Sequence, residues 1–523
     1  MNAKRFAGYA LAGLLAFSMA GCGEKPSPSS PAQSGSYKDT LNIGLDVEPE
    51  TLDPRLARDI SATRVFEQVC DSLVEVNEQL EPIPCLAESW ENPDELTWIF
   101  KLRQGVKFHD GSDFDAEDVK HTFDTIRDPE FGAVYAANYA SISEVVVEDP
   151  YTVKFILSEP YAPLLVYNMT LPIVPAEADD MEGFSEHPIG TGPYVFKEWS
   201  RNSKLTMEAN PDYWGEKAKT QNLVFHIVPE NATRVAALEA GDVDLVHTPL
   251  TPQDIQRLQQ DPRFVVDTMS GLGIHQAAFN HNVELLKDKR VRMALAHLID
   301  KETMAQELCQ GIERPGVSVL LPTSWAWSDS VTGFPYDPEK AKALFKEAGW
   351  EDSDGDGILD KDGNKLTVTI YTYTQDDLKM QMAEYMQNTF TSAGVDAQVK
   401  IGEWPSFIDD VSKGNYEIAV FGMMNMIDPD KYLFTYLRST SPSNWGGYSS
   451  AEFDSLVEQA RKISDQSERA KLYQKAAQIN NDEVMHDVMV YQGYVAIHSA
   501  KMEGFTPHPA GYWRSLRNAT VQD

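Results

Sequence analysis

Positive charge and cysteine are both scarce in this sequence. Lys and Arg number 45 against 80 Asp and Glu, which gives a formal net charge of −35. Such an acidic surface disfavours nucleic acid and anionic lipid headgroups as partners, because both are polyanions. Only 4 of the 523 residues are cysteine, and their positions match no zinc-site spacing. We therefore expect neither a nucleic-acid partner nor a metal centre.

Signature motifs of the common enzyme classes are missing as well. The chain has no G-x-S-x-G elbow, Walker loop or G-x-G-x-x-G run, and its scattered histidines form no H-E-x-x-H pair. Nucleophilic hydrolysis and nucleotide binding thus lack their usual parts. The sequence predicts that the protein is not an enzyme and carries no cofactor. A secreted hydrolase that uses paired carboxylates is the alternative.

Long apolar runs are confined to the N-terminus. After two basic residues, the run from about Phe6 to Ala20 is too short for a permanent membrane span and is typical of a signal peptide. It closes with Met-Ala-Gly-Cys22, which resembles the bacterial lipobox, whose cysteine is acylated. We expect a lipoprotein signal peptide over 1–22 with a lipidated Cys22, then a flexible tether over 23–38. The protein would be exported and held in the periplasm by its lipid anchor.

Three further cysteines follow the lipobox. Export would bring them into oxidising conditions, so Cys70 and Cys85 could form a disulfide that closes a small loop. Two buried thiols are the alternative. Cys309 would stay unpaired.

Strands and helices alternate along the rest of the chain, which predicts an α/β fold. The remaining length, roughly 500 residues, is too great for one hydrophobic core and predicts two or three subdomains. Residues 41–45 and 394–401 are expected to be strands. So is the apolar run 417–422, which we expect to be buried on both faces.

Three helices have clear boundary signals or amphipathic patterns. Asp115 is the expected N-cap of one. A second begins after Asp337, with Pro338 in its first position and Gly349 as its stop. A polar amphipathic helix is expected over 461–482.

Ordered sequence blocks run through most of the chain. The longest are Leu-Ala-Glu-Ser-Trp at 86–90 and Trp-Ile-Phe-Lys-Leu-Arg-Gln-Gly-Val-Lys-Phe-His-Asp-Gly at 98–111. Further blocks follow at 189–194, 210–214, 240–244, 279–280 and 291–300. In this order, they resemble the extracytoplasmic solute-binding family 5, the oligopeptide-, dipeptide- and nickel-binding class of ABC-transporter solute-binding proteins.

The resemblance implies a periplasmic-binding-protein-like clamp: two lobes of mixed sheets flanked by helices, with an extra third domain. Lobe I would combine 39–77, 188–268 and 489–523. The inserted domain would span 78–187, and lobe II would span 269–488. Ligand would bind between the lobes, which close by hinge motion.

The resemblance also implies a function. The chain would be the substrate-binding component of an ABC importer, a monomer that captures a peptide or peptide-like solute and delivers it to permease subunits in the inner membrane. One alternative is a non-peptide ligand, such as an oligosaccharide, an opine-like compound or a metal chelate. Another is a sensory role, in which the ligand is presented to a receptor.

The charged anchors of peptide-binding members of this family are absent here. In those members an Asp after the buried strand receives the α-ammonium of the peptide, and counting back from Pro429 places Asn425 at that position. Dipeptide binders resemble one another in an Arg that pairs with the ligand carboxylate, yet the corresponding segment 371–377 has no Arg. The resemblance therefore implies a ligand with different termini, unless Asp428 or Asp430 substitutes for the missing acid.

Other side chains are candidates for ligand contact on the same grounds. Aromatic rings would stack on the ligand and methionines would give an adaptable wall, with core packing as the alternative for each. These candidates are Trp404, Met423, Met426, Trp445, Tyr448, Asn280 and Trp325.

An acidic loop at 352–360 matches the start of a calcium-binding loop. Asp352, Asp354, Asp356 and Asp360 stand at oxygen-ligand positions, but Gly363 occupies the place of the bidentate Glu. We favour a Gly-rich hairpin without metal and keep calcium as the alternative.

Overall fold

The computed structural model describes residues 36–57, 59–247, 250–374 and 376–523. Tyr37–Asp523 forms one unit. The predicted signal peptide, the lipidated Cys22 and all but the last three residues of the predicted tether lie outside the described residues. Within the described ranges, none of the helices has the length and apolarity that a membrane crossing requires.

A large mixed sheet organises the chain. Its strand order is β17-β16-β18-β12-β19-β11-β1-β10-β9-β8, with β13 paired to β19 beside this path. The strands are β1 (Thr40–Leu45), β8 (Tyr194–Ser200), β9 (Lys204–Ala209), β10 (Asn222–Ile227), β11 (Leu245–His247), β12 (Phe264–Phe279), β13 (Arg314–Pro315), β16 (Thr367–Tyr373), β17 (Asp396–Gly402), β18 (Ile418–Met423) and β19 (His486–Ser499). This mixed sheet with flanking helices confirms the predicted α/β class.

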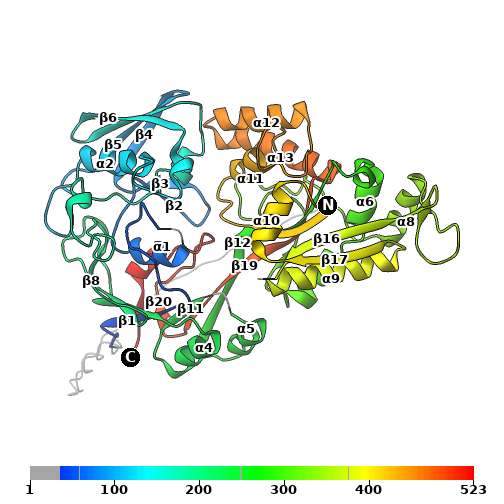
Figure 1. Cartoon of the computed structure of the whole chain (residues 1–523). Helices are drawn as coiled ribbons and strands as arrows, with labels where there is room; N and C mark the ends of the chain where they lie inside the picture. Colours follow the sequence, from blue (N-terminus) through cyan, green and yellow to red (C-terminus); the bar gives the residue numbers. More distant parts are fainter. Residues whose placement is uncertain (1–35, 58, 248–249, 375) are drawn as a thin grey trace, which may run out of the picture. The chain divides into compact units, whose positions relative to one another are not determined.

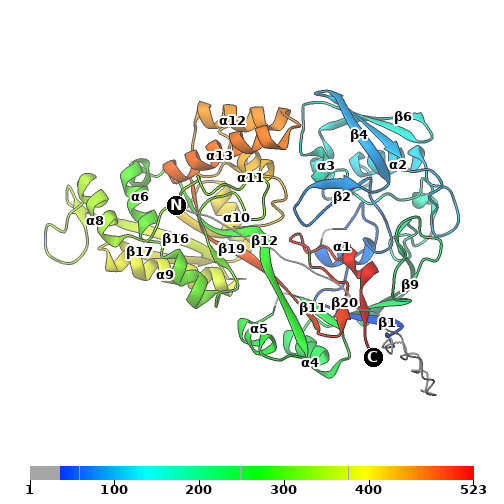
Figure 2. The same ribbon diagram turned by 180° about the vertical axis from the view of Figure 1, so that it is seen from behind.

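The long strands β12 and β19 connect two halves of this sheet, β17-β16-β18 on one side and β11-β1-β10-β9-β8 on the other. Figures 1 and 2 show β12 and β19 side by side at its centre. Phe264–Ser270 pairs with Gly493–Ser499, where β11 also joins β19. Ile274–Ala278 pairs with the first part of β19, where β18 joins β12. The register shifts between Ser270 and Ile274, so the regular ladder is interrupted where both strands pass from one half to the other.

A second sheet has its own core. It contains β4 (Ala87–Asp94), β5 (Thr97–Leu102), β7 (Thr152–Leu157) and β6 (Ile142–Asp149), in that order and all antiparallel. Helix α2 (Ala116–Arg127) packs on this sheet, and its buried Phe123 contacts Phe155 edge to face at 4.9 Å. The sheet lies within the predicted inserted domain 78–187, whose boundaries, like those of the two lobes, stay a prediction.

The remaining helices are connected to the main sheet or to each other. They are α1 (Ile60–Phe66), α3 (Leu164–Tyr167), α4 (Asn231–Ala240), α5 (Pro252–Gln259), α6 (Lys289–His297), α7 (Lys301–Thr303), α8 (Pro338–Glu347), α9 (Asp377–Ser392), α10 (Trp404–Ser412), α11 (Asp430–Leu437), α12 (Ala451–Lys462) and α13 (Gln466–Glu483).

Local sequence signals located several of these elements correctly. Asp115 caps α2 with a full capping box, and Asp337 caps α8, whose first residue is Pro338. Gly349 follows α8 with φ +88°, the left-handed backbone that a glycine stop supplies. Strand β18 is buried over its first four residues, as expected of the apolar run 417–422.

The helix predicted over 461–482 is wrong at its start. Arg461 belongs to α12, the backbone leaves the helix at Ile463, and α13 begins only after Asp465. Asp465 accepts a hydrogen bond from the Glu468 N–H at 3.0 Å, so this N-cap starts a new helix where the amphipathic pattern continues without a break.

The possible disulfide between Cys70 and Cys85 is also wrong, because all three cysteines of the described residues are free and buried. The Cys85 thiol donates to Glu75 Oε1 at 3.4 Å, and Cys70 packs against Gly190, where a Cβ would lie 2.6 Å from its Sγ. Burial raises the pKa of both thiols. Each sulfur is therefore fixed by a different set of neighbours.

Candidate ligand-binding cavity

A cavity of about 810 Å³ opens where β12 and β19 change register. This volume suits a small solute. Its lining comes from five places: α1 and the residues before it, the loop regions 135–139 and 170–172, the β12 and β19 junction, the segment 424–431, and the C-terminal segment 509–514. Both halves of the main sheet and the region of the second sheet thus contribute to one cavity.

Helix α1 supplies one wall, and its N-cap fixes the orientation of that wall. Asp59 accepts a hydrogen bond from the Ala62 N–H at 2.7 Å, which satisfies the first turn. Arg64, one turn along, donates through Nε to the Gly511 carbonyl at 3.0 Å and lies over the Trp513 ring at 4.4 Å. Its Nη1 contacts the buried His247 at 2.7 Å. Burial and Arg64 lower the pKa of His247 to about 4, so the ring is neutral at neutral pH.

Glu67 and Arg514 meet in the same wall. Glu67 accepts a hydrogen bond from the Trp513 backbone N–H, and Arg514 Nε lies 3.5 Å from Glu67 Oε2. Burial raises the pKa of Glu67 to about 7, although Arg514 opposes the shift. Arg514 also approaches Glu75, with Nη1 to Oε2 at 3.6 Å.

The segment after β18 supplies the facing wall. Met424, Asn425 and Lys431 line the cavity. Asn425 has φ +58°, a left-handed conformation that asparagine tolerates better than most residues. The structure therefore brings Asn425, predicted as a ligand contact, into the cavity.

Asp428 and Asp430, the two predicted substitutes for the missing acid, lie in a buried network beside the cavity lining. Asp428 pairs with Arg469 of α13 at 2.9 Å and is 1% exposed. Asp430 accepts from the Tyr473 hydroxyl at 3.3 Å, and Arg461 Nε lies 3.8 Å away. These contacts connect α11 to α13 and occupy the carboxylates that a ligand ammonium would need.

The other predicted contacts lie elsewhere among the described residues. Asn280 is buried and donates to the carbonyls of Gly414 and Tyr416 at 2.9 and 2.8 Å. Met426 is buried in the core that also contains Tyr432. Trp325 packs edge to face on Tyr473 at 6.1 Å.

The remaining aromatic candidates group around β18. Met423 and Trp445 surround a gap too small for a water molecule, next to Phe421. Tyr448 contacts His281 edge to face at 5.3 Å. Trp404 is 42% exposed and packs on Tyr373 at 4.7 Å. None of these side chains lines the 810 Å³ cavity, and their contact with a ligand stays a prediction.

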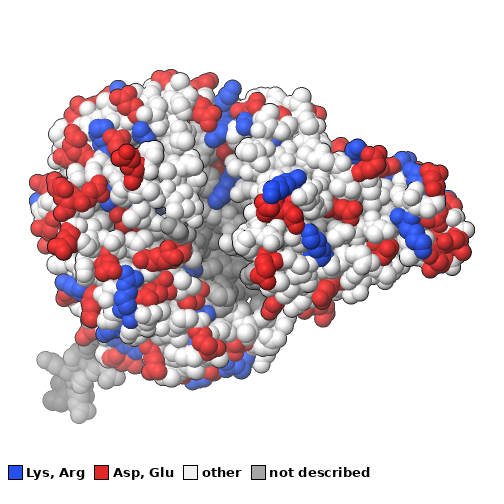
Figure 3. All heavy atoms as spheres, in the orientation of Figure 1, with Lys and Arg blue, Asp and Glu red and all other residues white. Residues whose placement is uncertain are grey.

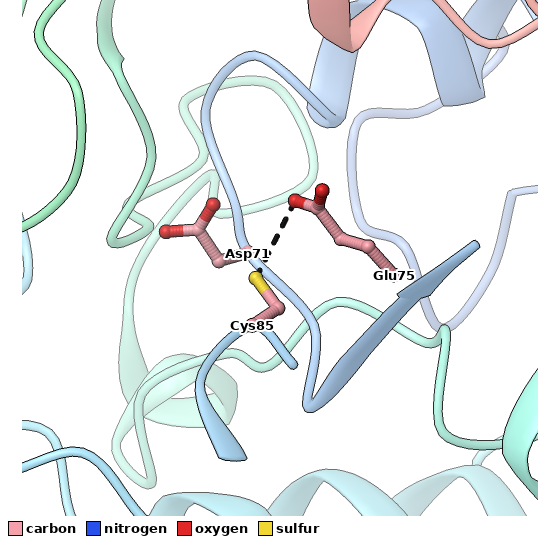
Figure 4. Close-up of side chains that lie close together, drawn as sticks. All are labelled: Asp71, Glu75 and Cys85. Carbon is pink, nitrogen blue, oxygen red and sulfur yellow. Dashed lines mark hydrogen bonds between the residues drawn. The ribbon is translucent and has the colours of Figure 1, made fainter. Parts of the chain in front are cut away.

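Glu75 and Cys85 point toward each other with Asp71 beside them (Figure 4), and one possible ligand atom of each lies within 4.8 Å of the others, the spacing of a potential metal site. Asp71 already accepts from the Thr191 hydroxyl at 3.0 Å and from Trp214 Nε1 at 2.8 Å. Burial and the neighbouring acids raise the pKa of the Cys85 thiol, which donates to Glu75 Oε1. The three groups form a buried polar network that supports the cavity wall.

The acidic loop 352–360 closes on itself. The carboxylates of Asp352, Asp354 and Asp360 lie within 4.8 Å of one another. Asp352 accepts from the Gly355 N–H at 2.7 Å, and Asp360 accepts from Ser353. An isolated bridge between Glu351 and Asp360 and the short pair β14 (Asp360–Lys361) and β15 (Asn364–Lys365) form the expected hairpin. Calcium binding stays a hypothesis.

Sequence reasoning missed most of the charged groups in the cavity. Arg64 and Glu67 follow an ordinary helix pattern, and Arg514 lies far from them in sequence. Lys431 is different, because it lies two residues after the Pro429 used to locate Asn425. Its single positive charge in a segment rich in acids was the available signal.

Comparison with known proteins places this arrangement in one family. The family model described as "Bacterial extracellular solute-binding proteins, family 5 Middle" matches residues 81–444. The oligopeptide-binding protein AppA of Bacillus subtilis is 28% identical over 518 residues, covering 95% of each chain. Heme-binding protein A of Haemophilus influenzae is 29% identical, covering 85% of this chain and 86% of the relative.

Solved structures agree with the sequence matches. HbpA2 from Haemophilus parasuis superposes with a TM-score of 0.83 at 28% identity, covering 92% of this chain and all of the other. The superposition covers most of the chain, and the family model includes strands from both halves of the main sheet. This chain therefore belongs to the bacterial extracellular solute-binding proteins of family 5.

Proposed function

We propose that this protein is the substrate-binding component of an ABC importer and that it captures a peptide or peptide-like solute in the 810 Å³ cavity. The position of the cavity carries the proposal. Its lining includes Gly271, Leu272, Gln492 and Gly493, where the long strands β12 and β19, which run through both halves, lose their regular pairing. A ligand at this point contacts both halves, so its binding favours a closed arrangement.

Closure would couple capture to delivery. A hinge motion at the β12 and β19 junction buries the ligand and changes the surface that the permease subunits contact. The relatives support this role, since oligopeptide-binding and heme-binding proteins both align along most of the chain. We further propose that the protein acts as a monomer, is not an enzyme, and is anchored in the periplasm through lipidated Cys22.

A non-peptide ligand is the second candidate. Asn425 lines the cavity where peptide-binding members are expected to have an acid, and both nearby acids are buried in pairs with other side chains. A relative named as a heme-binding protein supports a solute other than a peptide.

The test is to identify what the protein retains and whether it closes. The mature protein is purified without denaturation, its small-molecule content is extracted for mass spectrometry, and the emptied protein is titrated with the extract. We expect one dominant unmodified solute, saturable heat in calorimetry, and a smaller radius of gyration in X-ray scattering. A chemically altered product, or binding without compaction, would contradict the proposal.

A further inference from the structure

The cavity is rich in positive charge, whereas the whole molecule is acidic. Figure 3 shows acidic side chains spread over one face with Lys and Arg scattered among them, in keeping with the net charge of −35. Three cations, Arg64, Lys431 and Arg514, line the cavity, together with the acids Asp59 and Glu67. Asp59 caps α1, and Glu67 is held by Arg514 and a backbone N–H. Lys431 therefore remains, because Arg64 is held in the wall by Gly511, His247 and Trp513.

Lys431 forms no ion pair among the residues that the structure describes. Its Nζ lies 5.8 Å from the centre of the Tyr167 ring, a weak cation–π contact. The nearest acids along the chain, Asp428 and Asp430, already pair with Arg469 and Tyr473. The amine is half-buried in the cavity wall with no anion of its own.

The position is unfavourable for a cation in the ligand-free protein. Lys431 lies in the first turn of α11, the end where the helix dipole disfavours positive charge. Burial also lowers its pKa. The helix dipole and burial both make the charged form of Lys431 unfavourable in the folded protein. An anion bound in the cavity would offset both effects.

Arg64 of α1 also lines the cavity, and its partner His247 contacts Asp46 at 3.2 Å. Arg64 is 3% exposed, and its contacts are a carbonyl, a neutral histidine and an aromatic ring, with no carboxylate at ion-pair distance among the described residues. Arg64 therefore adds positive charge to the α1 wall while its guanidinium is held by neighbours within the protein.

We propose that the solute carries a carboxylate and that Lys431 is the side chain that binds it. This inference rests on the proposed function and names the substrate class of the same cavity. It also explains how Asn425 fits the site, because a neutral amide there leaves the charge of Lys431 free for the ligand.

The test compares two probes and three variants by titration calorimetry on the emptied protein. The probes are trialanine with a free carboxylate and trialanine amide. We expect the free acid to bind wild type about 10- to 100-fold more tightly than the amide, the range of a hydrogen bond to a charged group. Lys431→Gln should remove that difference, and Lys431→Arg should retain most of it. Lys413→Gln, which removes an exposed lysine outside the cavity, should behave as wild type.

A second measurement separates this inference from peptide binding. If neither trialanine binds, the peptide assignment of the proposed function fails, and the solute extracted from wild type decides the question of charge. A solute with a carboxylate that is retained by wild type and lost by Lys431→Gln supports the proposal. Equal binding of the acid and the amide, a retained solute without an acid group, or no retained solute and no probe binding would overturn it.

Folding of the variant is checked independently. Because the wild-type cation is unpaired, ligand-free Lys431→Gln should melt at the same temperature as wild type or higher. A clearly lower melting temperature would mean that Lys431 supports the fold, and would overturn the assignment.

Discussion

Glu67 is the cavity acid whose charge depends most on its surroundings. Its side chain is 5% exposed, and although Arg514 stabilises the carboxylate, burial raises its pKa to about 7. The neutral form is therefore favoured by folding. The contribution of Glu67 to the free energy of unfolding is fully present below the ordinary pKa of 4.5 and is lost as the pH rises through 7.

Replacing Glu67 with Gln should remove this pH dependence. The shift corresponds to about 3 kcal/mol between pH 4.5 and 7.5, so the wild type should lose stability relative to Glu67→Gln over this range. Differential scanning calorimetry of both proteins at several pH values measures the gap. Glu78→Gln, at an exposed position, is the control. A gap that does not change with pH would show that folding leaves the pKa of Glu67 unshifted.

The contact between α11 and α13 supports the wall that contains Lys431. Arg469 of α13 is 3% exposed, donates to the Ala460 carbonyl at 3.1 Å and pairs with Asp428. Tyr167 of α3 donates to the Asp428 carbonyl at 3.1 Å, which connects this network to the region of the second sheet. The short helix α11 is thus positioned by polar contacts on one side while Lys431 lines the cavity on the other.

Removing Arg469 should destabilise the protein strongly. Arg469→Met leaves Asp428 buried without its partner, and breaking such a pair costs about 3–5 kcal/mol. Chemical denaturation followed by circular dichroism measures the loss. Lys471→Met, at an exposed position on the same helix, should stay within about 0.5 kcal/mol of wild type. The double variant with Asp428→Asn should regain part of the loss, and no recovery would show that the pair is not the cause.

The junction of β12 and β19 connects the two halves of the molecule. Two glycines there differ in the space around them. A Cβ on Gly273 would lie 2.7 Å from the Met423 carbonyl oxygen and would also overlap the Gln492 side chain. A Cβ on Gly271 would lie 3.4 Å from its nearest atom, the Gln492 carbonyl oxygen. Of these two glycines, only Gly273 lies where the strands approach so closely that a Cβ does not fit.

Gly273→Ala should lower stability by about 1–3 kcal/mol, the usual cost of forcing extra atoms into a packed site. Gly271→Ala should change the melting temperature little. Thermal unfolding of the two variants and wild type measures both effects. Equal melting temperatures for all three would contradict the close crossing at Gly273.

Local signals in the sequence were sufficient for much of the secondary structure. Asp115 and Asp337 stand before apolar patterns that only a helix satisfies, and the run 417–422 has too few polar groups for any exposed position. The continuous pattern across Ile463 failed because two helices can share one apolar periodicity while an N-cap at Asp465 separates them. The cysteine pair failed because spacing along the chain does not report the direction of each thiol.

The sequence by itself determined the family and the fold class, because ordered blocks, capping residues and apolar periods are properties of neighbouring positions. It also predicted Asn425 as a ligand contact, and this residue lines the cavity. Only the tertiary structure decided which charges share that cavity: Arg64, Lys431 and Arg514 are separated by hundreds of residues or by whole elements. Their proximity results from strand pairing and helix packing, and so does the burial that leaves Lys431 without a carboxylate partner among the described residues.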